Sequence, residues 1–95
     1  MNRKEYKIYE GLVKYFPLAL KEVAHVSYMG SKQHHPDEPL HWDRAKSSDH
    51  LDALMRHLTD HAQGKLEDED GELHAAKCAW RSLAYLEILL EELKK

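Results

Sequence analysis

Two prolines in the middle of the chain constrain its fold more than any other feature. Pro36 and Pro39 each fix φ, lack a backbone N–H and disfavour helix at the residue before them. The segment 34–44 is therefore a loop, although it carries three histidines, a tryptophan, an arginine and three carboxylates. A loop this rich in polar chemistry, placed between helices, is where a small protein commonly keeps its functional groups.

The composition argues against several classes of protein. With 95 residues, the chain is expected to form one domain with a small core. Burial of further surface against a partner would help to stabilise it. A net charge of -3 disfavours nucleic acid as a partner. Cys78 is the only cysteine, so no intrachain disulfide forms, and no apolar run is long enough for a signal peptide or a membrane span. We therefore expect a cytoplasmic protein that binds neither nucleic acid nor a membrane.

Hydrophobic spacing predicts an all-α fold, with one helix before the loop and two after it. The predicted helices cover residues 17–32, 49–63 and 72–93. Pro17 suits a first helical position, and Gly64 suits a helix stop. Ser47 or Ser48 would cap the second helix. Residues 1–16 are expected to form an arm or a short helix.

The first predicted helix is apolar on two faces, which one small protomer cannot cover alone. We therefore predict a helical-bundle homo-oligomer, a dimer or larger. The same pattern places Glu22 among apolar neighbours, as a candidate buried carboxylate. In the other two helices the expected core stripes run through Leu51, Leu54, Met55, Leu58 and Ala62, and through Ala75, Cys78, Ala79, Ser82, Leu83, Leu86, Leu89, Leu90 and Leu93.

Carboxylates on the first two helices form one candidate site. Glu22 and Asp52 could meet across a helix pair, and Asp49 lies one turn before Asp52. Mg²⁺ prefers such hard oxygen ligands together with water and substrate phosphate. In the alternative interpretation, Glu22 is a buried partner of Arg56 or Lys77, and Asp52 forms a surface pair with Arg56. The residues alone leave both interpretations open.

The histidines form further candidates. His57 and His61 are spaced i,i+4, as are His74 and Cys78, and this spacing suits two ligands of a transition metal. His57 is not followed by Glu, so the pair does not match the HExxH zinc motif. Solvated or hydrogen-bonded side chains are the alternative for each pair.

Cations that a phosphate group would need gather around the loop and the start of the second helix, where a helix N-terminus also attracts anions. They are Lys32, Arg44, Lys46, Arg56, Lys77 and Arg81. Ordinary surface charge is the alternative in a chain with 33% charged residues. Trp42 would stack on a base or anchor the loop over the core, and the two roles are compatible.

Residues 22–32, Glu-Val-Ala-His-Val-Ser-Tyr-Met-Gly-Ser-Lys, are followed by His41-Trp42. Together they resemble the pattern EVA–V–YG–K…NW of the phage dATP/dGTP diphosphohydrolase family. Residues 51–58 are similar to its DALLRHL segment, and residues 68–80 to its D-ESG–H–HA–N segment. The resemblance extends over most of the chain. Three positions depart from the pattern: His41 replaces Asn, Lys77 replaces a second His, and Arg81 replaces Asn.

The resemblance implies a relative of the all-α MazG-like nucleotide pyrophosphohydrolases, with residues 17–95 as a single nucleotide-hydrolase-like domain. Such enzymes form helical-bundle oligomers and bind Mg²⁺ through carboxylates of neighbouring helices. The implied reaction converts a nucleoside triphosphate, with purine dNTP favoured, to the monophosphate and pyrophosphate. A phage-encoded protein would act in the host cytoplasm.

Under this hypothesis, Glu22 and Asp52 would hold Mg²⁺, or Mn²⁺, with Asp49 assisting. His57 or His74 would orient the water or the leaving group. The substrate-binding residues would be His41, Trp42, Lys32, Arg44, Lys46, Arg56, Lys77 and Arg81. The departures from the family pattern motivate an alternative, a non-catalytic helical homodimer that binds a nucleotide or a protein.

Overall fold

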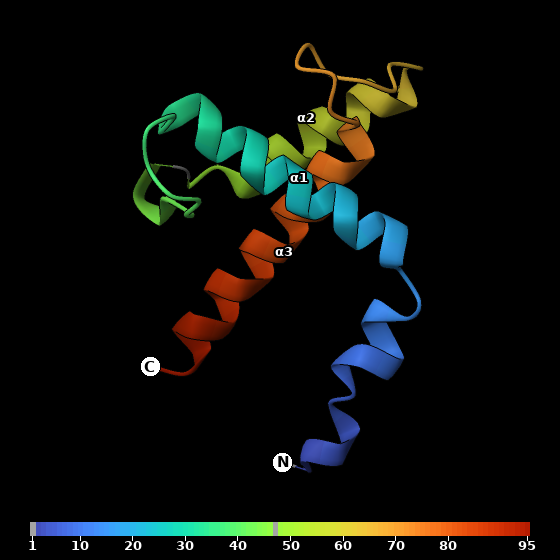
Figure 1. Ribbon diagram of the computed structural model, residues 1–95, viewed down its shortest axis with the longest axis vertical. Coiled ribbons are helices and arrows are strands. Elements are labelled where there is room, and N and C mark those ends of the chain that lie inside the picture. The colour runs from blue at the N-terminus through green and yellow to red at the C-terminus, as the bar shows by residue number, and fades with distance from the viewer. Residues whose placement is uncertain (1, 47) are drawn as a thin grey trace.

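The computed structural model describes residues 2–46 and 48–95, and this part of the chain is helical without a strand (Figure 1). The long helices are α1 (Pro17–His34), α2 (His50–Ala62) and α3 (His74–Leu93). Shorter turns form η1 (Arg3–Glu5), η2 (Tyr9–Val13) and η3 (Arg44–Lys46). The all-α prediction is confirmed, and each long helix begins and ends within two residues of its predicted bounds.

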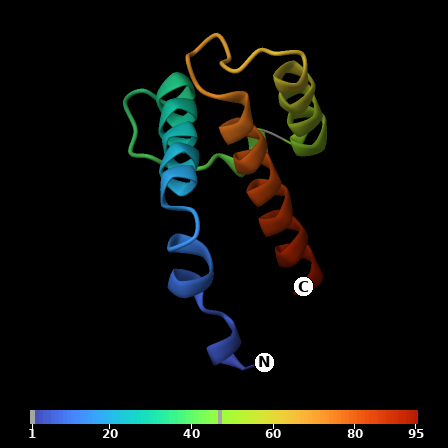
Figure 2. The same ribbon diagram turned by 90° about the vertical axis from the view of Figure 1, so that its right-hand side faces the viewer.

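Helix α3 is the centre of the arrangement, because it packs against α1 on one side and α2 on the other (Figure 2). The connector 63–73 leads from α2 over the top of the molecule into α3. At the other end, η1, η2 and the C-terminal half of α3 extend away from the point where the helices meet (Figure 1). The first half of α3 is therefore covered on two sides, and its second half is not.

Local residue chemistry explains where the helices begin and end. Pro17 occupies the first turn of α1, where its missing N–H costs nothing. Gly64 follows α2 with φ +93°, a conformation that favours glycine. The predicted serine cap of α2 is wrong for Ser48, because Asp49 is the N-cap residue and its side chain makes no capping hydrogen bond. Ser47 lies outside the described residues.

The buried faces of α2 and α3 differ from the predicted ones. In α2 the buried residues are His50 and Ala53, and in α3 they are His74, Ala76 and Ala84. The predicted core stripes are mostly exposed instead, at Leu51, Met55, Leu58, Ala62, Ala75, Ala79, Ser82, Leu83, Leu86, Leu89, Leu90 and Leu93. Small alanines allow α2 and α3 to pack closely through a face rich in polar groups. This contact leaves the leucine faces uncovered in a single chain.

Helix α1 is covered on one face only. Val23 and Ser31 are buried, whereas Leu18 on the second apolar face is 80% exposed. The predicted burial of Glu22 is wrong, because its side chain is exposed on α1. The physical reason is that α1 packs against α3, which covers one of its two apolar faces. In the described part of the chain, no helix has the length and apolar content that crossing a bilayer requires.

Candidate functional site

A cleft of about 560 Å³ lies between α1, the loop 35–43 and the first half of α3. We call it the α1/α3 cleft. Five residues that the sequence predicted to contact substrate or take part in catalysis line it: His41, Trp42, His57, Lys77 and Arg81. The loop, α2 and α3 contribute these residues, so the fold brings together positions that are far apart in the sequence. Residues of opposite charge, Asp70 and Glu72 among them, line it as well.

Aromatic rings form one wall of this cleft. Trp42 of the loop and Trp80 of α3 meet edge to face, with ring centroids 5.7 Å apart. The Trp80 Nε1–H donates to Ser27 Oγ at 2.6 Å, which ties α3 to α1. Trp42 Nε1 is buried but has no acceptor among the described residues. The cleft is thus lined by an aromatic wall, and one buried hydrogen-bond donor of that wall has no partner among the described residues.

His50 lies behind this wall and contacts both tryptophans. Its ring centroid is 6.3 Å from that of Trp42 and 6.1 Å from that of Trp80. Arg81 Nη1 lies 3.0 Å from His50 Nδ1, so the guanidinium donates to a neutral imidazole. Burial and the charge of Arg81 lower the pKa of His50, whereas Asp49 opposes the shift. The neutral His50 ring therefore accepts a hydrogen bond from Arg81 and helps to position the guanidinium.

The second cation of the cleft, Lys77, is held by two carboxylates. Its Nζ lies 2.8 Å from Asp68 Oδ2 and 2.9 Å from Asp70 Oδ2. Burial acts to lower the pKa of Lys77, but the hydrogen bonds to Asp68 and Asp70 outweigh it and raise the pKa. Lys77 is therefore a permanent cation at physiological pH.

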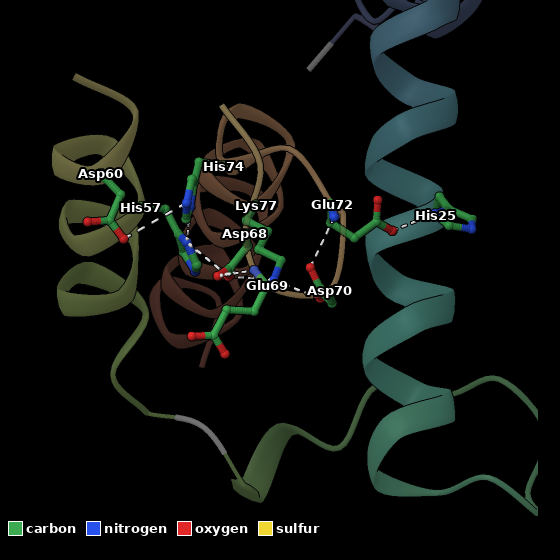
Figure 3. A network of polar contacts seen from close by, with 9 residues as sticks. All are labelled: His25, His57, Asp60, Asp68, Glu69, Asp70, Glu72, His74 and Lys77. Atoms are coloured by element: carbon green, nitrogen blue, oxygen red, sulfur yellow. Dashed lines mark hydrogen bonds and ion pairs between the residues drawn. The ribbon is translucent and has the colours of Figure 1, made fainter. Parts of the chain in front are cut away.

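A second group of polar residues lies beside the cleft, between α2, the connector and α3 (Figure 3). We call it the α2/α3 polar cluster, and it consists of His57, Asp60, Asp68, His74 and Lys77. His57 Nδ1 lies 2.9 Å from His74 Nδ1 and 3.9 Å from Asp68 Oδ2. His74 Nε2 lies 3.9 Å from Asp60 Oδ2. Burial, followed by the charge of Lys77, lowers the pKa of His57, so His57 is neutral near pH 7.

Glu72 is a buried residue that the sequence analysis did not identify. It is 5% exposed, and its Oε1 lies 2.5 Å from Nδ1 of His25 on α1 (Figure 3). Its backbone N–H also donates to Asp70 Oδ1 at 3.0 Å. Glu72 therefore joins α1 to the connector. No helical spacing marks it, because it lies in the connector before α3 begins.

The predicted Mg²⁺ ligands do not come together in one chain. Glu22, Asp49 and Asp52 are all exposed, and they form no group of three metal-ligand atoms among the described residues. The alternative pairs predicted for Glu22 and Asp52 do not form either among the residues that the structure describes, where Lys77 pairs with Asp68 and Asp70. Arg56 instead lies 3.9 Å from Asp49, which is also 3.6 Å from Arg81. A Mg²⁺ site of these three carboxylates therefore does not fit a single protomer.

Other predicted substrate contacts lie away from the α1/α3 cleft. Lys32 lies over the ring of Tyr28 at 5.8 Å, beside a smaller cavity of about 130 Å³ under the loop. Arg44 pairs with Glu91 and lies 4.2 Å from the centroid of the Trp42 ring, so it braces the loop against α3. The side chain of Lys46 lies outside the described part of the structure.

The predicted i,i+4 metal pairs also differ from the observed contacts. His61 is exposed, and Cys78 Sγ contacts the Leu54 carbonyl oxygen at 3.6 Å. His57 and His74 meet each other across the two helices instead. Their contact depends on the register of α2 against α3, which spacing within one helix does not reveal.

The comparisons with known proteins agree with the resemblance seen in the sequence. The family described as dATP/dGTP diphosphohydrolase, N-terminal, matches residues 2–95. No curated protein and no solved structure matches the chain.

Proposed function

Because the chain belongs to the dATP/dGTP diphosphohydrolase N-terminal family, we propose that it hydrolyses a purine deoxynucleoside triphosphate to the monophosphate and pyrophosphate. The α1/α3 cleft is the nucleotide site in this proposal. One observation carries it: an aromatic wall formed by Trp42 and Trp80 lies in the same cleft as the cations Lys77 and Arg81. A purine nucleotide presents an aromatic ring with hydrogen-bond acceptors at one end and phosphates at the other.

The base would contact the aromatic wall. Stacking of a base on an aromatic side chain contributes about 1–3 kcal/mol and tolerates different bases. Trp42 Nε1–H has no acceptor among the described residues but is closed to solvent, so it would donate to a ring nitrogen or carbonyl of the purine once the Trp42 side chain turns toward the cleft. This bond would favour one orientation of the base in the cleft.

The triphosphate would contact Lys77 and Arg81, which are i,i+4 neighbours on the cleft side of α3. Both are already held by carboxylates, Lys77 by Asp68 and Asp70, and Arg81 near Asp49. Phosphate oxygens would compete for the same donors. The advantage of this arrangement is that both cations are oriented before the substrate arrives.

Hydrolysis requires a water to attack phosphorus while pyrophosphate leaves, and the protein contributes mainly by positioning groups and stabilising charge. His57 lines the cleft as a neutral imidazole and would accept the proton of the attacking water. Lys77 and Arg81 would stabilise the charge that moves toward pyrophosphate. Mg²⁺ would supply further charge neutralisation, but Glu22, Asp49 and Asp52 do not fit it in one chain, so no step is assigned to that set.

A kinetic assay with dATP, dGTP, dCTP and dTTP tests the proposal, with Mg²⁺ or Mn²⁺ present. We expect pyrophosphate release with the purine substrates. His57→Gln should lower kcat about 100-fold with little change in KM. Arg81→Met should lower kcat/KM by a similar factor, and Trp42→Phe should mainly raise KM. Lys65→Met, on the exposed connector, is the matched control for loss of one positive charge.

The dispersal of the three predicted metal carboxylates favours a second candidate function, a helical homodimer that binds nucleotide without turnover. Binding of dATP or dGTP that depends on Trp42, with no pyrophosphate released under any metal condition, would support this candidate and contradict the first. Both candidates predict that nucleotide raises the melting temperature.

We also propose that the chain assembles as a homodimer through the leucine faces of α2 and α3. These faces expose Leu51, Met55, Leu58, Leu83, Leu86, Leu89, Leu90 and Leu93, whereas the buried apolar residues in the described part of the chain are Val23, Ala53, Ala76 and Ala84. So small a core gives a 95-residue chain little hydrophobic stabilisation. A single-chain mass by light scattering at micromolar concentration would contradict the dimer.

A further inference from the structure

The α2/α3 polar cluster contains two histidines and a carboxylate that come from three different segments. His57 belongs to α2, Asp68 to the connector, and His74 to the first turn of α3 (Figure 3). We propose that these three residues bind one divalent transition-metal ion of the Zn²⁺ or Co²⁺ type. This site is distinct from the predicted Mg²⁺ carboxylates, but it shares His57 and Lys77 with the proposed nucleotide site, so a bound ion would take the His57 lone pair that the proposed hydrolysis uses.

The ligand geometry supports the proposal. One ligand atom from each of His57, Asp68 and His74 lies within 4.8 Å of the other two. The donor atoms of a tetrahedral zinc site lie roughly 3.3 Å apart when the ion is 2.0–2.1 Å from each. The observed separations from His57 Nδ1 are 2.9 Å to His74 Nδ1 and 3.9 Å to Asp68 Oδ2. Side-chain shifts of well under 1 Å would adjust these two separations.

The two imidazoles direct at least one ligand lone pair into the cluster, where an ion could replace the hydrogen bond between them. Two Nδ1 atoms at 2.9 Å cannot both carry a proton, so at least one lone pair points into the cluster. His74 Nε2 faces Asp60 Oδ2 at 3.9 Å, and a carboxylate on that side favours the proton at Nε2. The Nδ1 lone pair of His74 is then directed at His57. His74 is 2% exposed, so this orientation is fixed by packing.

Lys77 is the group that competes with the ion. Its Nζ holds the same Asp68 oxygen at 2.8 Å, but it also holds Asp70 at 2.9 Å. An ion could take Asp68 while Lys77 keeps Asp70. Replacement of Lys77 by an uncharged residue should therefore tighten metal binding, an effect that no structural role of Lys77 predicts.

The donor set decides the class of metal. Two imidazoles and one carboxylate favour Zn²⁺, Co²⁺ or Ni²⁺, whereas Mg²⁺ prefers oxygen ligands and retains water. A second group, His35, Glu38 and His41, also meets the distance requirement. Glu38 and His41 are exposed, however, and His41 Nδ1 donates to the Pro39 carbonyl at 2.9 Å. The loop group provides the matched control.

Titration of tag-free protein with Co²⁺, followed by visible absorption, tests the site. We expect one ion per chain, displaced by Zn²⁺ but not by excess Mg²⁺. His57→Gln and Asp68→Asn should each weaken binding at least 10-fold, and His74→Gln should do so most strongly. Lys77→Met should tighten binding about 10-fold, and His41→Gln should leave it unchanged. Zn²⁺ should raise the melting temperature of the wild type and of His41→Gln, but not of Asp68→Asn.

Two results would overturn the proposal: no stoichiometric binding of Co²⁺ or Zn²⁺ to the wild type, or binding that His41→Gln removes and Asp68→Asn does not. Circular dichroism shows which variants fold. If His74→Gln does not fold, Asp68→Asn and Lys77→Met decide the outcome, because their predicted effects have opposite signs. The probe is the metal alone, so the metal titration and the nucleotide assay are read separately, and failure of one is distinguishable from failure of the other.

Discussion

The two halves of α3 differ in what they bury. The first half presents His74, Lys77 and Arg81 to its neighbours, and all three are buried or half-buried in paired arrangements. The second half carries most of the leucines of the helix, and Leu83, Leu86, Leu89, Leu90 and Leu93 are exposed. Hydrophobicity and burial therefore run in opposite directions along the same helix.

This contrast teaches that the apolar pattern in a small chain does not have to mark that chain's own core. Polar groups tolerate burial where each has a partner, as Lys77 has in Asp68 and Asp70. Leucines gain nothing from exposure to water, and a continuous exposed apolar surface is typical of an interface. The first half of α3 is then the wall of a site, and we propose the second half as the contact between protomers.

The largest expected effect is on the apolar half. The double change Leu86→Asp and Leu90→Asp places two charges in the proposed dimer contact, where burial without partners is costly. We expect the dimer dissociation constant to rise at least 1,000-fold, which corresponds to about 4 kcal/mol. Analytical ultracentrifugation over a range of concentrations measures it. Leu66→Asp, an exposed leucine of the connector, should leave assembly unchanged, and an unchanged dimer in the double variant would remove α3 from the interface.

In the polar half, Lys77→Met should lower the free energy of unfolding by about 2 kcal/mol, because it leaves the half-buried Asp68 and the adjacent Asp70 without their cation. Lys95→Met is the matched control, since its pair with Glu92 is mostly exposed and should contribute less than about 0.5 kcal/mol. Urea denaturation in metal-free buffer measures both. An equal loss of unfolding free energy in the two variants would show that the ion pairs of Lys77 stabilise the first half of α3 no more than an exposed pair does.

The sequence was sufficient for the helices but not for their faces. Pro17, Gly64 and the two prolines of the loop fix where helices begin and end through local backbone chemistry, so their bounds were predictable. Which face of α3 is buried depends on its partners, and the apolar pattern pointed to the leucines. The face that is packed instead also has helical spacing, through His74, Lys77, Arg81 and Ala84. Most of its residues are polar, so its spacing does not predict a buried face.

The candidate site was predictable where side-chain chemistry identified its residues, and not where contacts between helices decide the arrangement. Trp42, Lys77 and Arg81 could be selected from their chemistry and their resemblance to a family pattern, and the fold brings them to one cleft. Glu22 could not be placed, because its exposure depends on which face of α1 packs against α3. The contact of His57 with His74 required the register between two helices.

A smaller effect is expected from the hydrogen bond between α1 and the polar half of α3. Ser27→Ala removes the acceptor of the Trp80 indole N–H, and we expect a loss of about 1 kcal/mol in the free energy of unfolding. Tyr85→Phe, which removes a hydroxyl from an exposed side chain in the apolar half, should change stability by less than about 0.5 kcal/mol. Thermal melts of both variants provide the comparison. A loss in Tyr85→Phe as large as that in Ser27→Ala would place a polar contact where we describe an apolar surface.

The smallest expected effect is a dependence of stability on pH. It tests the polar half of α3 through His50 of α2, which contacts Arg81. Burial, and then Arg81, lower the pKa of His50 in the folded chain below its ordinary value of about 6.5. The unfolded state therefore binds this proton more readily, so the contribution of His50 to stability is fully present above about pH 6.5 and declines as the pH falls toward the lowered pKa. Denaturation midpoints of wild type and His50→Gln between about pH 8 and 5.5 measure this contribution, because every other side chain is the same in both proteins. The wild type should lose more stability on acidification than His50→Gln, and parallel curves would mean that His50 is not held neutral beside Arg81.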